Sequence, residues 1–188
     1  MNLKRPLILA SNSPRRQYLM REAGFEFAVR PSHADESFPP EMPVDQVAAH
    51  LAERKARSLA PEGTEDVILA SDTVVIIDQT ILNKPADRAE AIAMLQKLSG
   101  RTHRVMTAVC LLSREKMDVF QDETHVTFKT LTQPEIEHYI DTHRPYDKAG
   151  AYGAQDWIGM VAITRIEGSY FTVMGLPMHL VYQHLLSF

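Results

Sequence analysis

The sequence of 188 residues contains a single cysteine, Cys110. One cysteine excludes an internal disulfide and a zinc site built on cysteines, and it is typical of proteins in the reducing cytoplasm. The apolar runs are too short for a membrane span, and the first residues lack the apolar core of a signal peptide. We therefore predict a cytoplasmic protein that does not cross a membrane.

An excess of basic charge is also missing. The 20 Lys and Arg residues face 24 Asp and Glu residues, which gives a formal net charge of −4. Without a global positive field we expect no binding of nucleic acid, and a site for a polyanion must be a local basic cluster. The histidines show no HExxH spacing and no GxSxG elbow occurs, which disfavours zinc and serine hydrolases.

The composition is that of a globular protein, with 45% hydrophobic and 23% charged residues. The length suits one domain with a substantial core. No internal repeat or low-complexity segment interrupts the chain. We predict a single domain over residues 1–188, in which two intimate lobes are an alternative.

Residues 7–16 read LILASNSPRR and predict a strand, a tight loop and the start of a helix. Ser13 can cap this helix through its hydroxyl, and Pro14 suits the first helical position. Free backbone N–H groups at the helix N-terminus, with Arg15 and Arg16 beside them, form a site for an anion such as a phosphate. The same pattern also occurs where it only caps a helix, so both interpretations stay open.

Residues 67–77, VILASDTVVII, form a second buried run that polar residues interrupt around Asp72. A carboxylate in such a run is costly to bury unless it is paired, bound to a metal or at a strand end facing a cleft. Asp72 is therefore a candidate catalytic residue, although a turn aspartate gives the same pattern. Residues 78–79 then predict a hairpin turn, residues 80–82 the returning strand, and Lys84 lies on a constrained loop.

Residues 43–59 predict an amphipathic helix, with Lys55 on the same face as its apolar residues. This lysine is either a stem at the edge of the apolar stripe or a residue of a site. Further helices are predicted at 14–23, 87–98, 132–142 and from Pro177 onward. Thr132 and Glu135 are expected to form a capping box at the start of the third of these. Predicted strands cover 25–29, two or three segments between 103 and 131, 161–166 and 170–173.

Residues 147–155, DKAGAYGAQ, are rich in glycine but lack the spacing of a P-loop or a dinucleotide fold. Tyr152 and Gln155 could stack on a base and hydrogen-bond to it, while a glycine-permitted bend explains the stretch equally well. Elsewhere the carboxylates of Asp35, Glu36 and Asp72 suit Mg²⁺ or Mn²⁺. Such oxygens together with basic residues are what phosphoryl chemistry requires.

Several motifs together resemble the Maf family of nucleotide pyrophosphatases. In chain order they are LASNSPRR, ASDTVV, the Lys84-Pro85 pair, KLSGRTHRVMTAV, DKAGAYGAQ and GSYFTVMGLP, and they cover nearly the whole chain. The resemblance implies a Maf/ITPase-like α/β fold, with a mixed, curved central sheet flanked by helices and two lobes around a cleft. It also implies metal-dependent hydrolysis of a nucleoside triphosphate to the monophosphate and pyrophosphate, a house-cleaning role and a possible homodimer. The alternatives are a nucleotide-sensing regulator of septum formation and a pyrophosphatase with another base preference, such as 7-methyl-GTP.

The resemblance also implies roles for individual residues. Asp72 would accept the proton of the attacking water and, with Glu36, would bind Mg²⁺ or Mn²⁺. Thr73 and Gln155 would lie near the base. The residues that would bind the phosphates are Ser13, Arg15, Arg16, Lys55, Lys84 and Lys148.

One branch of the family resembles a 7-methyl-GTP pyrophosphatase. It typically carries an aromatic residue, Gln and Glu where this sequence has Arg15, Thr73 and Gln155, so the sequence resembles the dTTP/UTP branch. A neutral amide such as that of Gln155 can donate and accept toward a pyrimidine edge. Ala154 and Asp156 depart from the usual late motif, and the extra carboxylate either weakens binding of an anionic substrate or faces solvent.

Overall fold

The computed structural model describes residue 3, residues 5–59 and residues 66–188. The chain divides into two compact units. The first unit consists of Met1–Asp72, Thr107–Asp122 and Gly175–Phe188, and the second of Thr73–Met106 and Glu123–Met174. Each unit contains its own group of candidate site residues.

The strands of the described residues form one mixed sheet of seven strands, with the order β2-β1-β3-β5-β6-β7 and with β4 paired to β3. β1 runs parallel to β2 and β3, whereas the β3–β4 and β6–β7 pairs are antiparallel. The predicted mixed sheet flanked by helices is confirmed. The strands are β1 (Leu7–Leu9), β2 (Ala28–Val29), β3 (Val67–Ile77), β4 (Thr80–Leu82), β5 (Thr102–Leu112), β6 (Met117–Phe128) and β7 (Ile163–Glu167).

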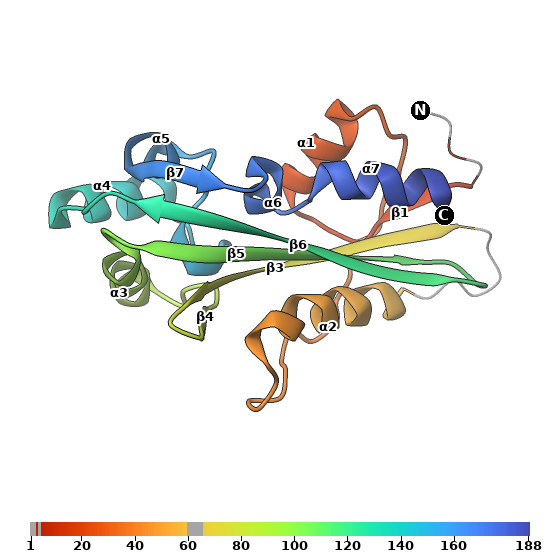
Figure 1. The fold of residues 1–188 in the computed structure, drawn as a ribbon, viewed down its shortest axis with the longest axis horizontal. Helices are drawn as coiled ribbons and strands as arrows, with labels where there is room; N and C mark the ends of the chain where they lie inside the picture. The colour runs from red at the N-terminus through yellow and green to blue at the C-terminus, as the bar shows by residue number, and fades with distance from the viewer. Residues whose placement is uncertain (1–2, 4, 60–65) are drawn as a thin grey trace. The chain divides into compact units, whose positions relative to one another are not determined.

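In the first unit, three helices flank β1 and β3. They are α1 (Pro14–Glu22), α2 (Val44–Arg57) and α7 (Met178–Ser187). Figure 1 shows α2 on one side of these strands and α1 and α7 on the other. Both strands are apolar and buried along most of their length, as expected for parallel strands covered on both faces. The amphipathic α2 is confirmed, because Val47, Ala48, Leu51 and Ala52 are buried along one side.

The start of α1 differs from the prediction in one detail. Pro14 occupies the first turn as expected, but the Ser13 side chain makes no capping hydrogen bond. The neighbouring Ser11 Oγ instead accepts a hydrogen bond from the backbone N–H of Ser13, at 3.2 Å. The prediction that the Ser13 hydroxyl caps α1 is therefore wrong.

β3 runs without a break through its three polar residues, so the alternative of a turn aspartate at residue 72 is wrong. Asp72 lies within the strand and not at its end. The β-branched residues that follow, beginning with Thr73, favour the extended backbone. The predicted hairpin is confirmed beyond Ile77, because Asp78 and Gln79 both have positive φ angles, 50° and 58°, before β4 begins.

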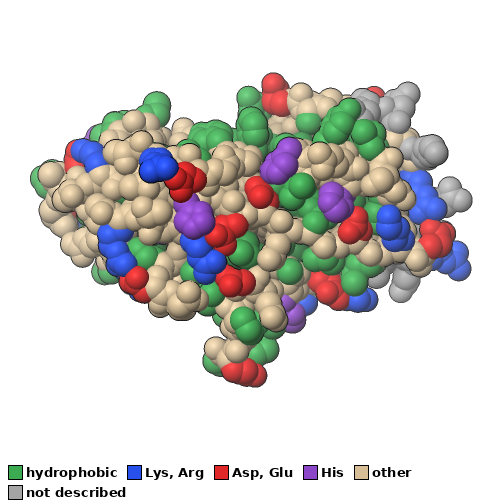
Figure 2. All heavy atoms as spheres, viewed as in Figure 1, with side chains coloured by type: hydrophobic (Ala, Val, Ile, Leu, Met, Phe, Trp, Pro, Cys, Tyr) green, Lys and Arg blue, Asp and Glu red, His purple; other side chains and the backbone are tan. Residues whose placement is uncertain are grey.

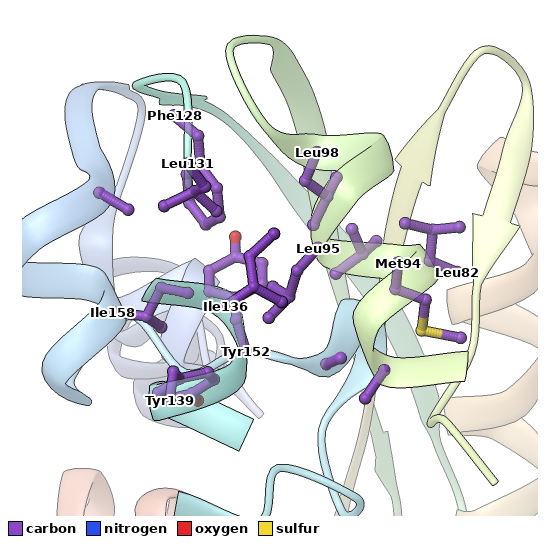
Figure 3. Close-up of a cluster of buried hydrophobic side chains, with 14 of the residues drawn as sticks. Leu82, Met94, Leu95, Leu98, Phe128, Leu131, Ile136, Tyr139, Tyr152 and Ile158 are labelled. Atoms are coloured by element: carbon purple, nitrogen blue, oxygen red, sulfur yellow. The ribbon is translucent and has the colours of Figure 1, made fainter. Parts of the chain in front are cut away.

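An apolar core stabilises the second unit (Figure 3). Helices α3 (Arg88–Leu98) and α4 (Gln133–His143) lie beside each other and contribute much of it. Strand β6 and helix α5 (Trp157–Ala162) supply further side chains. Its large members are Leu82, Met94, Leu95, Leu98, Phe128, Leu131, Ile136, Tyr139, Tyr152 and Ile158.

The predicted strand at residues 170–173 is wrong, because Tyr170–Met174 form the short helix α6. A short apolar run gives no clear period, and tertiary contacts decide its structure. Thr124 Oγ1 accepts from the Ser169 N–H and donates to the Ser169 carbonyl oxygen, both at 3.0 Å, which fixes the chain just before α6. The strand predicted at 161–166 begins at Ile163, since the preceding residues belong to α5.

The predicted capping box of α4 is present. Thr132 Oγ1 accepts from the Glu135 backbone N–H at 3.4 Å, and Glu135 Oε2 accepts from the Thr132 N–H at 2.8 Å. We expect Thr132→Ala to lower the free energy of unfolding by about 1 kcal/mol, because a helix N–H loses its acceptor. Urea denaturation followed by circular dichroism measures this change. Thr142→Ala, an exposed change on the same helix, is the control, and an equal loss there would contradict the capping argument.

The surface carries charges of both signs. Figure 2 shows acidic and basic side chains interspersed on the face that it views, in keeping with the net charge of −4. Among the helices of the described residues, none is long and apolar enough to span a membrane.

Candidate active site

Asp72, Lys55 and Glu36 come together in the first unit from a strand, a helix and a loop. Lys55 Nζ donates to Asp72 Oδ1 at 2.6 Å and forms an ion pair with Glu36 Oε1 at 2.7 Å. The side chains of Lys55 and Asp72 are 13% and 11% exposed, and that of Glu36 is 45% exposed. Lys55 therefore points from α2 toward the carboxylate in β3 and does not extend into solvent.

The environment of Asp72 favours a carboxylate that is a stronger base than usual. Burial raises the pKa of Asp72, and the positive charges of Lys55 and Arg16 offset this effect only in part. Burial likewise lowers the pKa of Arg16, while the nearby charge of Asp72 opposes that shift. A raised carboxyl pKa suits a group that accepts a proton from water near neutral pH.

Arg16 is held by two backbone carbonyl groups. Its Nε donates to the Gly175 oxygen at 2.9 Å and its Nη1 to the Ser71 oxygen at 2.8 Å. The Ser71 hydroxyl also donates to the Gly175 oxygen, at 3.0 Å. Gly175 has a φ of 110°, a conformation that side-chain-bearing residues rarely adopt. Ser71 and Gly175 were not predicted as anchors of Arg16, and the only signal for them in the sequence is the glycine before the Leu-Pro pair.

The other predicted residues of the first unit lie near these elements. Ser13 and Arg15 are half-buried at the start of α1. Asp35, a further candidate carboxylate, is turned toward Ser37 and Arg54 and does not join the Lys55 group. The structure therefore separates the adjacent residues Asp35 and Glu36, and only Glu36 pairs with Lys55.

A second group of predicted residues lies in the second unit. Gln155 Nε2 donates to Asp156 Oδ1 at 3.0 Å. Lys148 Nζ donates to Asp147 Oδ1 at 2.8 Å and lies 3.8 Å from Asp156 Oδ2. Asp156 thus lies beside both Gln155, which was expected near a base, and Lys148, which was expected at a phosphate.

The loop that carries Lys84 is hydrogen-bonded to the glycine-rich stretch, residues 147–155, in the same unit. The Gly150 N–H donates to the Asn83 carbonyl oxygen at 3.2 Å, and Lys84 follows as an exposed residue. A Cβ atom on Gly150 would approach the Val75 side chain to 3.0 Å, so the loop packs closely on β3. Thr73 is half-buried in the same strand.

Comparison with known proteins decides the family. Residues 6–188 match the family described as Maf-like protein. The chain belongs to the Maf-like family. This Maf-like chain is 46% identical to a dTTP/UTP pyrophosphatase of Porphyromonas gingivalis, with 100% of this chain and 96% of the relative covered. It is 41% identical to a dTTP/UTP pyrophosphatase of Flavobacterium johnsoniae, with 97% and 94% covered. Among solved structures, the Ham1 protein of Staphylococcus aureus matches with a TM-score of 0.49 and 13% identity, over 66% of this chain and 72% of that one.

Stacking of Tyr152 on a base was one of two interpretations of the glycine-rich stretch, and the structure of this Maf-like protein does not support it. Tyr152 belongs to the core, where its ring meets Phe128 and His103 edge to face. Its hydroxyl lies 2.7 Å from His103 Nε2, and burial lowers the pKa of that histidine to about 3. The Tyr152 ring is therefore enclosed by protein side chains, and it does not offer a face on which a base could stack.

The Maf family implies a divalent metal ion, and two residues of this chain fit one. Glu36 Oε1 and Asp72 Oδ1 both lie within 2.7 Å of the same ammonium nitrogen, so the two oxygens face one point. Mg²⁺ at phosphate sites uses one or two carboxylates and completes its coordination with water and phosphate oxygens. Among the described residues no group of three or more His, Cys, Asp or Glu side chains could hold a metal ion. Metal binding by Glu36 and Asp72 stays a prediction.

Proposed function

We propose that this Maf-like protein is a nucleoside triphosphate pyrophosphatase that hydrolyses dTTP and UTP, and modified pyrimidine nucleotides, to the monophosphate and pyrophosphate. Its full-length relatives at 41% to 46% identity carry the name dTTP/UTP pyrophosphatase, which supports this substrate class. The single observation that carries the chemistry is the buried carboxylate of Asp72, held by Lys55 beside Arg16. We further propose that it acts in the cytoplasm, without nucleic acid, and as a homodimer.

In the proposed reaction, the Asp72 carboxylate accepts a proton from water while the water oxygen attacks the α-phosphorus. The bond from that phosphorus to the bridging oxygen breaks, and pyrophosphate leaves with the electron pair. Lys55 and Arg16 offset the negative charge that gathers on the phosphate oxygens. Mg²⁺ or Mn²⁺, held by Glu36 and Asp72, would supply further neutralisation of the phosphate charge when bound.

The remaining roles rest on the resemblance of the motifs to those of the family. In the first unit, Ser13 and Arg15 are proposed as phosphate ligands beside Arg16. In the second unit, Lys84 and Lys148 are proposed as phosphate ligands. Thr73 and Gln155 are proposed as residues near the base.

A panel of nucleotides tests the proposal. Purified protein with Mg²⁺ should release pyrophosphate from dTTP and UTP at least roughly tenfold faster, in kcat/KM, than from 7-methyl-GTP, because the base contacts differ. A coupled assay for pyrophosphate gives the rates, and EDTA should abolish them until Mg²⁺ is restored. Equal or faster turnover of 7-methyl-GTP would overturn the assignment to the dTTP/UTP branch.

A further inference from the structure

The side chain of Asp156 does not cap helix α5, although its position predicts a cap. Asp156 stands at the N-cap of α5, where an aspartate ordinarily accepts a hydrogen bond from a helix N–H. Its side chain makes no such bond, although its backbone oxygen accepts from Gly159 N–H at 3.0 Å. The carboxylate is 16% exposed and is turned inward. The carboxylate therefore neither caps the helix nor faces solvent. Its contacts with side chains inside the second unit determine its orientation.

Both oxygens of the Asp156 carboxylate accept hydrogen bonds from neighbouring side chains. Oδ2 accepts from the Tyr139 hydroxyl at 2.8 Å, and Oδ1 accepts from Gln155 Nε2 at 3.0 Å. The Tyr139 hydroxyl in turn accepts from the Gly153 N–H at 3.1 Å. Tyr139 is fully buried in α4, so the carboxylate is tied to a rigid part of the core.

These contacts fix which way the Gln155 amide points. A carboxylate only accepts hydrogen bonds, so the amide group that faces Asp156 must be the NH₂ group and not the oxygen. Rotation of the amide by half a turn would place two oxygens against each other. The Gln155 oxygen, Oε1, therefore lies on the other side, where it is buried and has no hydrogen-bond partner among the described residues.

The close approach of the chain at Gly153 supports the same arrangement. A Cβ atom there would lie 2.6 Å from Asp156 Oδ2 and 2.6 Å from Gln155 Nε2. Any side chain at Gly153 would therefore separate the carboxylate from the amide. The glycine at this place allows the contact between Asp156 and Gln155.

We propose that Asp156 is a positioning residue for base recognition, which holds Nε2 of Gln155 and thereby fixes Oε1 as the acceptor that the amide presents to a base. An acceptor in this place selects bases with a ring N–H donor, such as uracil and thymine, over cytosine. The inference rests on the proposed function and deepens it, because it names the hydrogen-bonding pattern of the substrate base.

The chemistry of the bases explains the selection. Uracil and thymine carry an N–H group at ring position N3, whereas the N3 of cytosine is an acceptor. An amide that is free to rotate would serve both, by offering its oxygen to one and its NH₂ group to the other. When cytosine binds beside a fixed amide, Gln155 Oε1 and the cytosine N3 face each other, and both are acceptors. The amine of cytosine is attached to the neighbouring ring carbon and does not lie at N3. Oε1 of Gln155 is a buried acceptor without a partner in the described part of the chain, so a hydrogen bond from the base to Oε1 removes an energetic cost. The base reaches Oε1 after a local shift of the side chains that cover it.

Asp156→Asn tests the inference, because an asparagine at this position can face Gln155 with either its oxygen or its NH₂ group. Wild-type protein should prefer UTP over CTP by roughly tenfold to a hundredfold in kcat/KM, and should use 3-methyl-UTP, which lacks the N–H, as poorly as CTP. In Asp156→Asn the ratio of UTP to CTP should fall to about threefold or less, mainly through KM, since kcat depends on other residues. Asp141→Asn is the matched control: it removes an exposed carboxylate from α4, paired with Arg88, and should leave the ratio unchanged.

The outcomes separate this inference from the proposed function. Release of pyrophosphate from UTP with an unchanged ratio in Asp156→Asn, or rapid turnover of 3-methyl-UTP by the wild type, would overturn the positioning role alone. No release from any nucleotide would overturn both proposals. If Asp156→Asn lowers the melting temperature, Asp156→Gly takes its place, because glycine is tolerated at an N-cap, and the same fall in the ratio is expected.

Discussion

Asp72→Asn should reduce kcat for dTTP and UTP by roughly a thousandfold, within the range typical of losing a general base. The asparagine keeps the size of the side chain and an oxygen that can accept from Lys55, but it cannot take a proton from water. Lys55 also retains its ion pair with Glu36, at 2.7 Å. We therefore expect the fold to survive while the activity is lost.

Rates of pyrophosphate release and thermal unfolding, measured on the same preparation, check this expectation. The control is Asp118→Asn, which removes a carboxylate of the first unit that pairs with His184, at 2.8 Å from its Nδ1, whereas Lys55 pairs with Glu36 and Asp72. Near wild-type activity in Asp72→Asn would show that Asp72 is not the base. An effect on septation that persisted in this inactive variant would favour the regulatory alternative.

The pH profile gives an independent view of the same residue. A general base acts only when it is ionised, so kcat/KM should fall as the pH drops through the pKa of Asp72. Burial raises this pKa above the ordinary value of 3.8, and the charge of Lys55 opposes the shift only in part. The acid limb should therefore lie at higher pH than for an exposed aspartate, and it should be absent from the residual activity of Asp72→Asn.

Local patterns were sufficient to predict most elements of the fold. Pro14 at the start of α1, the capping box of Thr132 and Glu135, and the turn at residues 78–79 each act within a few residues of sequence. The suspicion about Asp72 came from a rule of the same kind, since a carboxylate within an apolar run needs a partner. Such features can be read from one sequence because their physical causes are local.

The features that were missed depend on contacts between distant residues. Arg16 is anchored by the carbonyl oxygen of Gly175, which is 159 positions away. The helix α6 begins where Thr124 fixes the backbone of Ser169, 45 positions away. Tyr152 looked like a base-stacking residue, because nothing in its own neighbourhood reveals that Phe128 and His103 enclose its ring.

Lys55→Met should also have a large effect, and it should change two properties of the site in opposite directions. The activity should fall, and the affinity for Mn²⁺ should rise. The ammonium group of Lys55 lies between Glu36 and Asp72 and occupies the point that a metal ion bound by both carboxylates would need. Its removal should lower kcat/KM for UTP by on the order of a hundredfold, because one positive charge near the phosphates is lost. Without nucleotide, however, the two carboxylates should bind Mn²⁺ more tightly, by on the order of tenfold, since their internal counter-ion is gone.

Titration calorimetry with Mn²⁺, in the absence of nucleotide, measures the affinity directly, and the rise in melting temperature on adding Mn²⁺ should be larger in the variant. Arg54→Met is the matched control, because Arg54 precedes Lys55 on α2 but pairs with the exposed Asp35, at 3.4 Å. Its Mn²⁺ affinity should equal that of the wild type. If Lys55→Met binds Mn²⁺ no better than Arg54→Met, then Glu36 and Asp72 do not form the metal site, and the role of Asp72 reduces to that of the base.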